Sequence, residues 1–177
     1  MKFDPSIVQT RIQSPLGDMV LAATHQGLAG VWFTDQRHRP EALDFKNVAH
    51  PWPTQDDHPT LVTAARQLAE FFSGKRKVFD LPLDINGGTL FQQSVWRALL
   101  KIPHGKTTSY GSISRQIDNP TAVRAVGSAV GRNPLSLIVP CHRVLGGDGS
   151  LTGYAGGLHR KTALLTLEGA SFLAQAA

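Results

Sequence analysis

The sequence predicts two domains: a small α/β domain over residues 1–85 and a mainly helical domain with a helix-turn-helix over residues 89–177. Short apolar runs separated by turn-forming residues occupy the first third of the chain, a pattern that is typical of strands. After Asn86-Gly87-Gly88 the pattern changes to amphipathic helices with capping residues. A chain of 177 residues, 41% of them hydrophobic, can also bury a core.

In the first domain we expect strands at Met19–Ala22 and Leu28–Phe33, because these apolar runs flank a turn-forming His-Gln-Gly sequence. The stretch from Arg37 to Pro59 is rich in proline and has no period, which indicates a loop. Thr60 is then the expected cap of a helix that ends at Gly74. The partial alternation from Val78 to Ile85 predicts a further strand.

In the second domain Thr89 and Gln92 form a predicted capping box, and Pro103 stops the helix that follows. A short helix is expected from Ser109 to Ile117, and a second one opens at Asn119-Pro120 and runs to about Gly131. Such a pair with a tight turn is consistent with a helix-turn-helix, which also occurs in proteins that never touch DNA. The apolar run Leu135–Pro140 is expected to be a buried strand or core segment, and a last helix begins near Gly157.

Eighteen Lys and Arg residues against thirteen Asp and Glu residues give a net charge of +5 and a pI near 9.7. This charge suits a polyanionic partner, although many basic proteins bind none. Neither a signal peptide nor a membrane span is expected, because Asp4 and Pro5 interrupt the N-terminus and the uncharged run Met19–Thr34 is short and broken. We therefore expect a soluble cytoplasmic protein in a reducing compartment.

Cys141 is the single cysteine, which excludes an intramolecular disulfide and a Cys-rich zinc site, and no metal site is expected. A lone cysteine is usually a small buried hydrophobe. Three features favour a nucleophile instead: the preceding Pro140 fixes the backbone, His142 and Arg143 can favour a thiolate, and glycine-rich segments follow that let backbone N–H groups approach a ligand. Because neighbouring side chains of a strand point in opposite directions, His142 can serve Cys141 only if the chain turns there.

Three further residues need interpretation, and for two of them, Glu168 and Arg124, two alternatives are open. Glu168, in the final turn of the last helix, is either a solvated surface acid or the group that folds inward to orient His142. Tyr110 is by default a packed aromatic residue with its hydroxyl at the rim. Arg124 stands alone on a helix of small apolar residues, where it either extends to solvent or lies against a surface that approaches closely.

Several motifs occur in order between Thr89 and Gly169. They are Phe91-Gln92-Gln93-Ser94-Val95-Trp96, Ile102-Pro103, Ser109-Tyr110-Gly111, Arg124-Ala125-Val126-Gly127, Asn133-Pro134, Ile138-Val139-Pro140-Cys141-His142-Arg143-Val144, Gly153-Tyr154-Ala155-Gly156-Gly157 and Glu168-Gly169. Together they resemble the O6-alkylguanine-DNA alkyltransferases, also called methylated-DNA–protein-cysteine methyltransferases. The Pro-Cys-His-Arg-Val string is the most specific of them, and Ser14-Pro15-Leu16-Gly17 is weakly similar to the first domain of that family.

The resemblance implies a role for each residue around the thiol. Cys141 would accept the alkyl group, activated by His142 through a bridging water, and Glu168 would hold the histidine. Tyr110 would donate a proton or hydrogen bond to N3 of the departing guanine. Asn133 would brace the turn between the recognition helix and the active site.

The resemblance also implies how substrate and DNA are bound. The backbone near Ala155 would bond to the guanine O6, with Tyr154 and Gly156 in the same binding segment, and the carbonyl groups of Cys141 and Val144 would contact the exocyclic amine. Arg124 would replace the flipped nucleotide in the base stack, which offsets part of the lost stacking. The other residues implied in contacts with the minor groove are Ala125, Gly127, Gly111 and Asn119.

The expected protein is thus a monomer that repairs double-stranded DNA without a cofactor and reacts once, because a thioether has no easy leaving step. O6-alkylguanine is the implied substrate, with O4-alkylthymine as a second candidate. Val123 departs from the Ala that is common in relatives, which affects the fit to the groove. Two alternatives remain at this stage: a non-catalytic helix-turn-helix DNA-binding protein, and a cysteine hydrolase that turns over.

Overall fold

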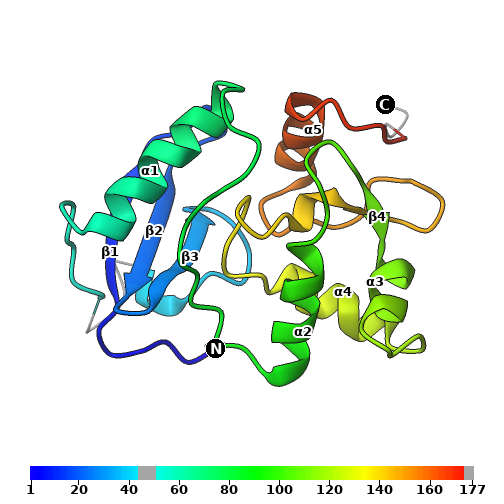
Figure 1. Cartoon of the computed structure of the whole chain (residues 1–177), viewed down its shortest axis with the longest axis horizontal. Helices are drawn as coiled ribbons and strands as arrows, with labels where there is room; N and C mark the ends of the chain where they lie inside the picture. Colours follow the sequence, from blue (N-terminus) through cyan, green and yellow to red (C-terminus); the bar gives the residue numbers. More distant parts are fainter. Residues whose placement is uncertain (44–50, 174–177) are drawn as a thin grey trace. The chain divides into compact units, whose positions relative to one another are not determined.

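The structure, a computed structural model, describes residues 1–43 and 51–173 and contains two compact units (Figure 1). The first unit comprises Met1–Gly88 together with Pro134–Ser136, and the second comprises Thr89–Asn133 and the chain from Leu137 onward. Part of the loop expected between Arg37 and Pro59, residues 44–50, lies outside the described residues, as do residues 174–177.

The first unit is built on an antiparallel sheet in the order β1-β2-β3. Strands β2 (Met19–Thr24) and β3 (Gly27–Phe33) are buried along their whole length, which confirms the two strands predicted from their apolar runs. Strand β1 (Val8–Ile12) was not predicted, because three polar residues occupy its centre. It pairs with β2 from Val8 opposite Ala23 to Ile12 opposite Met19.

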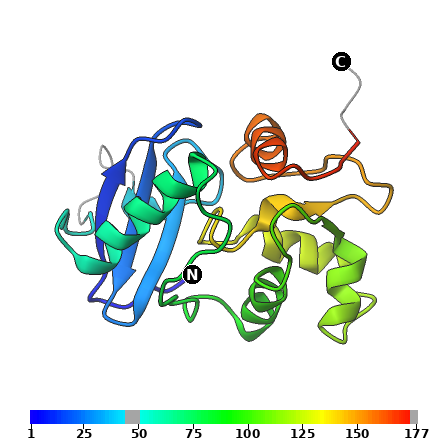
Figure 2. The same cartoon turned by 45° about the horizontal axis from the view of Figure 1, so that its top comes forward.

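Helix α1 (Pro59–Phe72) lies across one face of this sheet (Figure 2). Its buried side chains include Leu61, Leu68 and Phe71. The prediction of Thr60 as its cap is wrong. His58 is the N-cap residue, and Pro59 takes the first position of the helix, where its missing N–H has no cost. Trp32 of β3 joins a separate apolar cluster.

The strand predicted from Val78 to Ile85 does not form. Leu83 makes only an isolated parallel bridge with Leu28, in which Leu28 N donates to Pro82 O at 2.8 Å and Asp84 N donates to Leu28 O at 2.8 Å. Pro82 has no N–H to extend the ladder, so the pairing stops there.

The run Leu135–Pro140 is a buried core segment and not a regular strand. Leu135 bridges Val31 of β3, whose N–H donates to Pro134 O at 2.8 Å and whose carbonyl accepts from Ser136 N at 3.0 Å. The positive φ of Leu137, 70°, then ends the extended conformation.

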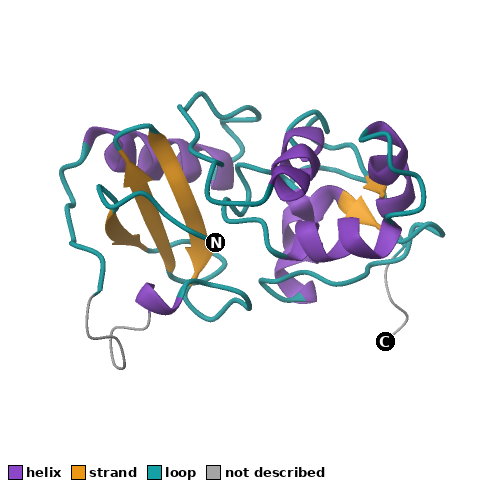
Figure 3. Ribbon diagram, turned by 90° about the horizontal axis from the view of Figure 1, so that it is seen from below, coloured by secondary structure: helices purple, strands orange, loops and turns teal. Residues whose placement is uncertain are grey.

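Around a short parallel pair of strands, β4 (Thr108–Ser109) and β5 (Val144–Leu145), the second unit is helical (Figure 3). Its α-helices are α2 (Leu90–Leu99), α3 (Tyr110–Gln116), α4 (Val123–Gly131) and α5 (Leu158–Leu167). The described residues also form two 3-10 turns, η1 (Glu41–Leu43) in the first unit and η2 (Cys141–Arg143) in the second.

Helices α3 and α4 are the pair predicted as a helix-turn-helix. The second of them begins at Val123, later than expected from Asn119-Pro120, because Asp118 adopts a positive φ of 55° and the chain needs several residues to turn. Trp96 of α2 donates its indole N–H to the carbonyl of Ala129 at 2.9 Å, which fixes α2 against α4. No helix among residues 1–43 and 51–173 is long and apolar enough to cross a membrane.

The predicted capping box at the start of α2 is confirmed. Gln92 N donates to Thr89 Oγ1 at 3.2 Å, and Thr89 N donates to Gln92 Oε1 at 2.9 Å. Both N–H groups would otherwise lack a partner in the first turn.

Replacing Thr89 by Ala should therefore lower the free energy of unfolding by about 1 kcal/mol, since the first turn loses its side-chain acceptor. Urea denaturation measures this change. Thr63→Ala, inside α1, is the matched control and should cause no comparable loss. Equal effects of the two changes would show that the cap contributes nothing.

Candidate active site

The chain turns at Cys141. Such a turn is necessary if His142 is to serve the thiol. Cys141, His142 and Arg143 form η2, in which Arg143 N donates to the Pro140 carbonyl at 3.0 Å, and β5 follows directly. The backbone of Pro140, with ψ at 63°, is not that of a strand. The side chains of Cys141 and His142 are therefore not constrained to opposite faces, and both are buried.

Asn133 connects the end of α4 to this turn. Its Nδ2 donates to Cys141 Sγ at 3.1 Å and to the Val139 carbonyl at 2.8 Å. Burial raises the pKa of the Cys141 thiol, while the Asn133 hydrogen bond and the charge of Lys161 lower it. The resting sulfur is thus a thiol that needs a proton acceptor.

Glu168, directly after α5, folds inward. Its side chain has 0% exposure, and its Oε1 lies 2.9 Å from His142 Nε2. Although burial raises the pKa of the carboxyl, hydrogen bonds from His142 and Arg143 outweigh it and lower the pKa to about 2. The alternative of a solvated surface acid does not match this geometry.

The loop after α2 reaches the same carboxylate, because Gly105 N donates to Glu168 Oε2 at 3.2 Å. Gly105 has a positive φ of 71°, and a Cβ at this position would lie 2.9 Å from the Glu168 carbonyl oxygen. The close approach of the loop to the end of α5 therefore depends on the glycine.

The imidazole of His142 is neutral in this environment. Burial lowers the pKa of its imidazole below the ordinary value, and the partly opposing influence is Glu168. The ring is therefore neutral at neutral pH. Glu168 occupies Nε2, whereas the buried Nδ1 has no hydrogen-bond partner among the described residues. Nδ1 is the nitrogen left to exchange a proton.

Arg143 does not act on the thiol in the way the sequence suggested. Its guanidinium donates to both carboxylate oxygens of Glu168 and to the Ile102 carbonyl. The cation whose charge lowers the thiol pKa is Lys161, a residue that sequence reasoning missed.

Lys161 is fully buried in α5, where its Nζ donates to the Val144 carbonyl at 2.5 Å and to the Thr152 carbonyl at 2.6 Å. Burial lowers the pKa of its amine to about 8. A signal was present in the sequence, because Lys161 follows Leu158 by three residues and precedes Leu164 by three. A lysine on the apolar stripe of a helix is unusual, and when it is fully buried its amine needs polar partners.

The residues predicted to bind the base lie in β5 and in the loop before α5. Val144, Tyr154 and Gly156 are buried, and Ala155 is half-buried. Lys161 ties these two segments together through its two carbonyl contacts. Arg160 holds the loop further by donating to the Gly156 carbonyl at 2.9 Å.

Tyr110, the first residue of α3, lies beside α4. A Cβ built on Gly127 would meet its ring at 3.8 Å, so the two helices pack closely at this glycine. Burial raises the pKa of the Tyr110 hydroxyl, and the Cys141 charge acts in the same direction. The hydrogen bond with Thr152 opposes both influences.

The residues predicted to bind DNA all lie on the helix pair. Arg124 and Ala125 are exposed near the start of α4, and Asn119 is exposed in the turn before it. Gly111 of α3 and Gly127 of α4 are half-buried. Val123 is 40% exposed at the first position of α4.

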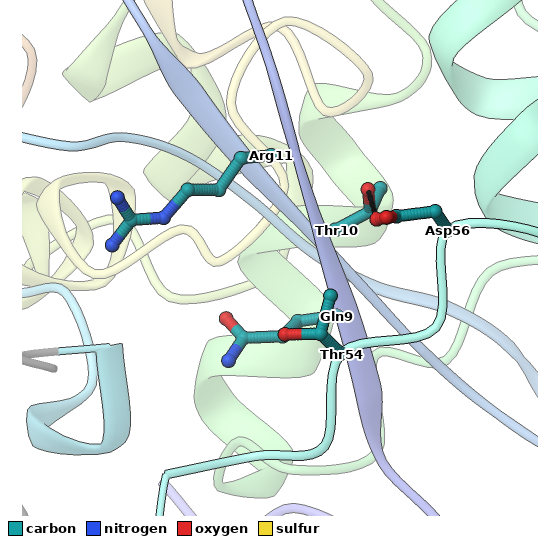
Figure 4. Close-up of a pocket in the computed structure, with 5 residues that line it drawn as sticks. All are labelled: Gln9, Thr10, Arg11, Thr54 and Asp56. Carbon is teal, nitrogen blue, oxygen red and sulfur yellow. Dashed lines mark hydrogen bonds between the residues drawn. The ribbon is translucent and has the colours of Figure 1, made fainter.

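A pocket of about 430 Å³ in the first unit has a different character (Figure 4). It is lined by Gln9, Thr10, Arg11, Thr54 and Asp56, and the Thr10 hydroxyl donates to Asp56 Oδ1 at 2.5 Å. None of these five residues is a nucleophile of the kind found at Cys141. No group of three or more His, Cys, Asp and Glu residues in the described part of the chain could hold a metal ion.

Two family models match the chain. The DNA-binding domain of 6-O-methylguanine DNA methyltransferase matches residues 90–170, and the ribonuclease-like domain of the same proteins matches residues 7–85. The chain belongs to the 6-O-methylguanine DNA methyltransferase family. The family models thereby confirm the predicted resemblance, and the predicted fold class agrees with the structure and its relatives.

Individual members of this methyltransferase family are similar over most of their length. Methylated-DNA–protein-cysteine methyltransferases from Mycobacterium tuberculosis and Methanosarcina acetivorans are each 46% identical over 157 residues, which cover 89% of this chain and 89% and 95% of the relatives. A crystal structure of the Mycobacterium tuberculosis O6-methylguanine methyltransferase matches with a TM-score of 0.79 and 44% identity, over 92% of this chain and 93% of the other. A structure of Mycobacterium tuberculosis OGT in complex with DNA matches with a TM-score of 0.78 and 45% identity, over 92% of each chain.

The buried carboxylate of this methyltransferase should make its stability depend on pH. The pKa of Glu168 is lowered from 4.5 to about 2, so its ionised form stabilises the fold above pH 4.5, and this contribution is lost as the pH falls toward 2. A pKa shift of this size corresponds to roughly 3 kcal/mol in the free energy of unfolding at neutral pH. Glu168→Gln should lower the free energy of unfolding at neutral pH, and its difference from wild type should shrink in acid.

Urea titrations at several pH values measure this difference. Glu70→Gln is the matched control, because Glu70 also contacts two arginines, Arg66 and Arg76, but near the surface. Its effect should be much smaller. A Glu168→Gln deficit that stays constant from neutral to acid pH would contradict the prediction.

Proposed function

We propose that the protein repairs DNA by transferring an alkyl group from O6 of a guanine to Sγ of Cys141. Membership in the family supports transfer to a cysteine, and Cys141 is the single cysteine of the chain. The observation that carries the assignment is the neutral, buried His142, which follows Cys141 in η2, with Nε2 held by Glu168 and Nδ1 unpartnered among the described residues.

In the proposed reaction the Cys141 proton passes through a bridging water to His142 Nδ1. The thiolate attacks the alkyl carbon, so that the S–C bond forms while the C–O6 bond breaks. Tyr110 donates a proton or hydrogen bond to N3 of the departing guanine, which stabilises its developing charge. Glu168 stabilises the imidazolium that His142 becomes.

Two interactions with the thiol and two backbone positions near it support this sequence of events. Asn133 donates to Sγ, and Lys161 supplies a nearby positive charge, and both favour the thiolate over the thiol. Lys161 also holds the Val144 carbonyl, which we assign to the exocyclic amine of guanine. The backbone at Ala155 would bond to O6, between the buried Tyr154 and Gly156.

The DNA contact is proposed for the helix pair. The alkylated oxygen lies inside the duplex, so the base must be extruded before Cys141 can reach it. Exposed Arg124 would fill the vacated stack, while Ala125 and Gly127 allow α4 to enter the minor groove, with Gly111 and Asn119 nearby. The proposal includes a monomer that acts on double-stranded DNA in the cytoplasm, with domains over residues 1–85 and 89–177.

Single use is the first prediction of this function. With excess duplex that contains O6-methylguanine, each protein should gain one methyl group, on Cys141, because the thioether has no leaving step. Intact mass spectrometry and peptide mapping measure the product, and Cys141→Ser should gain none. Many repaired bases per protein would instead support a hydrolase.

The second prediction separates base extrusion from affinity. Arg124→Ala should strongly slow single-turnover transfer from duplex at saturating DNA, and slow transfer from free O6-benzylguanine much less, since only the duplex needs its base unstacked. Arg132→Ala, an exposed cation at the end of α4, is the matched control. Both changes should make the slope of log affinity against log salt shallower by about one unit at most.

Only Arg124→Ala should reduce the duplex rate beyond its effect on binding. Equal fractional losses on duplex and free base would assign Arg124 to the support of the pocket or the fold.

A further inference from the structure

Arg143 is buried and fully engaged, yet the proposed transfer gives it no step. Its Nε donates to Glu168 Oε2 at 2.8 Å, its Nη2 to Glu168 Oε1 at 2.8 Å and its Nη1 to the Ile102 carbonyl at 2.6 Å. The residue is 6% exposed. Two parallel bonds to one carboxylate form the strongest type of side-chain ion pair, and they fix the orientation of the carboxylate.

His142 shares the same carboxylate, because Glu168 Oε1 accepts from Arg143 and also lies 2.9 Å from His142 Nε2. With a neutral histidine, the buried set of Arg143, Glu168 and His142 has zero net charge. Without the guanidinium, the set would have a charge of minus one. A buried negative charge is relieved most directly by protonation of the histidine, which would then already hold the proton it must accept.

We propose that Arg143 is a positioning residue that neutralises Glu168 and thereby keeps His142 unprotonated, ready to accept the proton of Cys141. This inference rests on the proposed function, because it assumes that His142 is the proton acceptor. Transfer of the proton from Sγ to Nδ1 then creates a thiolate and an imidazolium together, and the net charge of the buried site does not change.

The charges around His142 agree with this role. Burial is the main influence that lowers the pKa of His142, and the positive charges of Arg143 and Lys161 lower it further, against the opposing influence of Glu168. Arg143 and Cys141 lie in the same turn, η2, Lys161 comes from α5, and Glu168 follows it. The loop after α2 contributes the Ile102 carbonyl, which accepts from Arg143, and the Gly105 N–H, which donates to Glu168.

The test is the pH profile of single-turnover transfer from O6-methylguanine duplex. Arg143→Met should move the acid limb of the profile upward by about one pH unit or more, so that the rate falls about tenfold in weak acid and much less at alkaline pH. Arg143→Lys keeps the charge and should leave the limb near its wild-type position. Arg66→Met, in the exposed pair with Glu70, is the matched control and should leave the profile unchanged.

A charge-balanced double variant, Arg143→Met with Glu168→Gln, restores zero net charge. It should be slower than wild type, because nothing stabilises the imidazolium, but its acid limb should return toward the wild-type position. A rate that falls by one common factor at every pH in Arg143→Met would overturn the proposal, because a purely structural role predicts that result.

A second measurement needs neither transfer nor a folded variant. In labelled wild-type protein, NMR titration should show that the His142 ring takes up its proton below the ordinary imidazole pKa of about 6.5. A His142 resonance that titrates at or above that ordinary value would overturn the proposal even if transfer to Cys141 is observed. Absence of methylation at Cys141 with the expected titration would contradict only the proposed function.

Discussion

The ionised carboxylate of Glu168 is the constraint around which the second unit is arranged. A buried charge of this kind costs several kcal/mol unless it is paired and hydrogen-bonded. Its partners come from two places: His142 and Arg143 from the turn that presents Cys141, and Gly105 from the loop after α2. The end of α5, the turn and the loop therefore hold one another in place, and the position of the Cys141 thiol depends on all three.

The fold could be predicted where a local sequence pattern is compatible with a single type of secondary structure. The buried strands β2 and β3 and the capping box of α2 follow from local residues, and all three are present. Strand β1 could not be predicted, because an edge with polar side chains shows no apolar pattern. The stretch ending at Ile85 alternates like a strand, but Pro82 limits it to a single bridge.

For the site, the sequence revealed which residues are chemically able to act, and the structure shows how they share charge. Glu168 at the end of a helix has two equally reasonable environments, and only tertiary packing decides that it faces His142. Arg143 was assigned to the thiol because it is close in sequence, whereas its guanidinium binds the carboxylate. The sequence shows that Lys161 lies on an apolar stripe of its helix. It does not show that the amine binds the Val144 carbonyl, because the two residues are far apart in the chain.

The short segment Pro134–Ser136 belongs to the first unit, although the chain on both sides of it belongs to the second. Its hydrogen bonds with Val31 cover part of the outer edge of β3. On the ribosome, about a hundred further residues must be added after β3 before this segment exists, which takes roughly 5 to 20 s. For that time the nascent protein carries an open strand edge, the feature most prone to pairing with another chain. A gene-fusion boundary placed at residue 88 would make that transient exposure permanent.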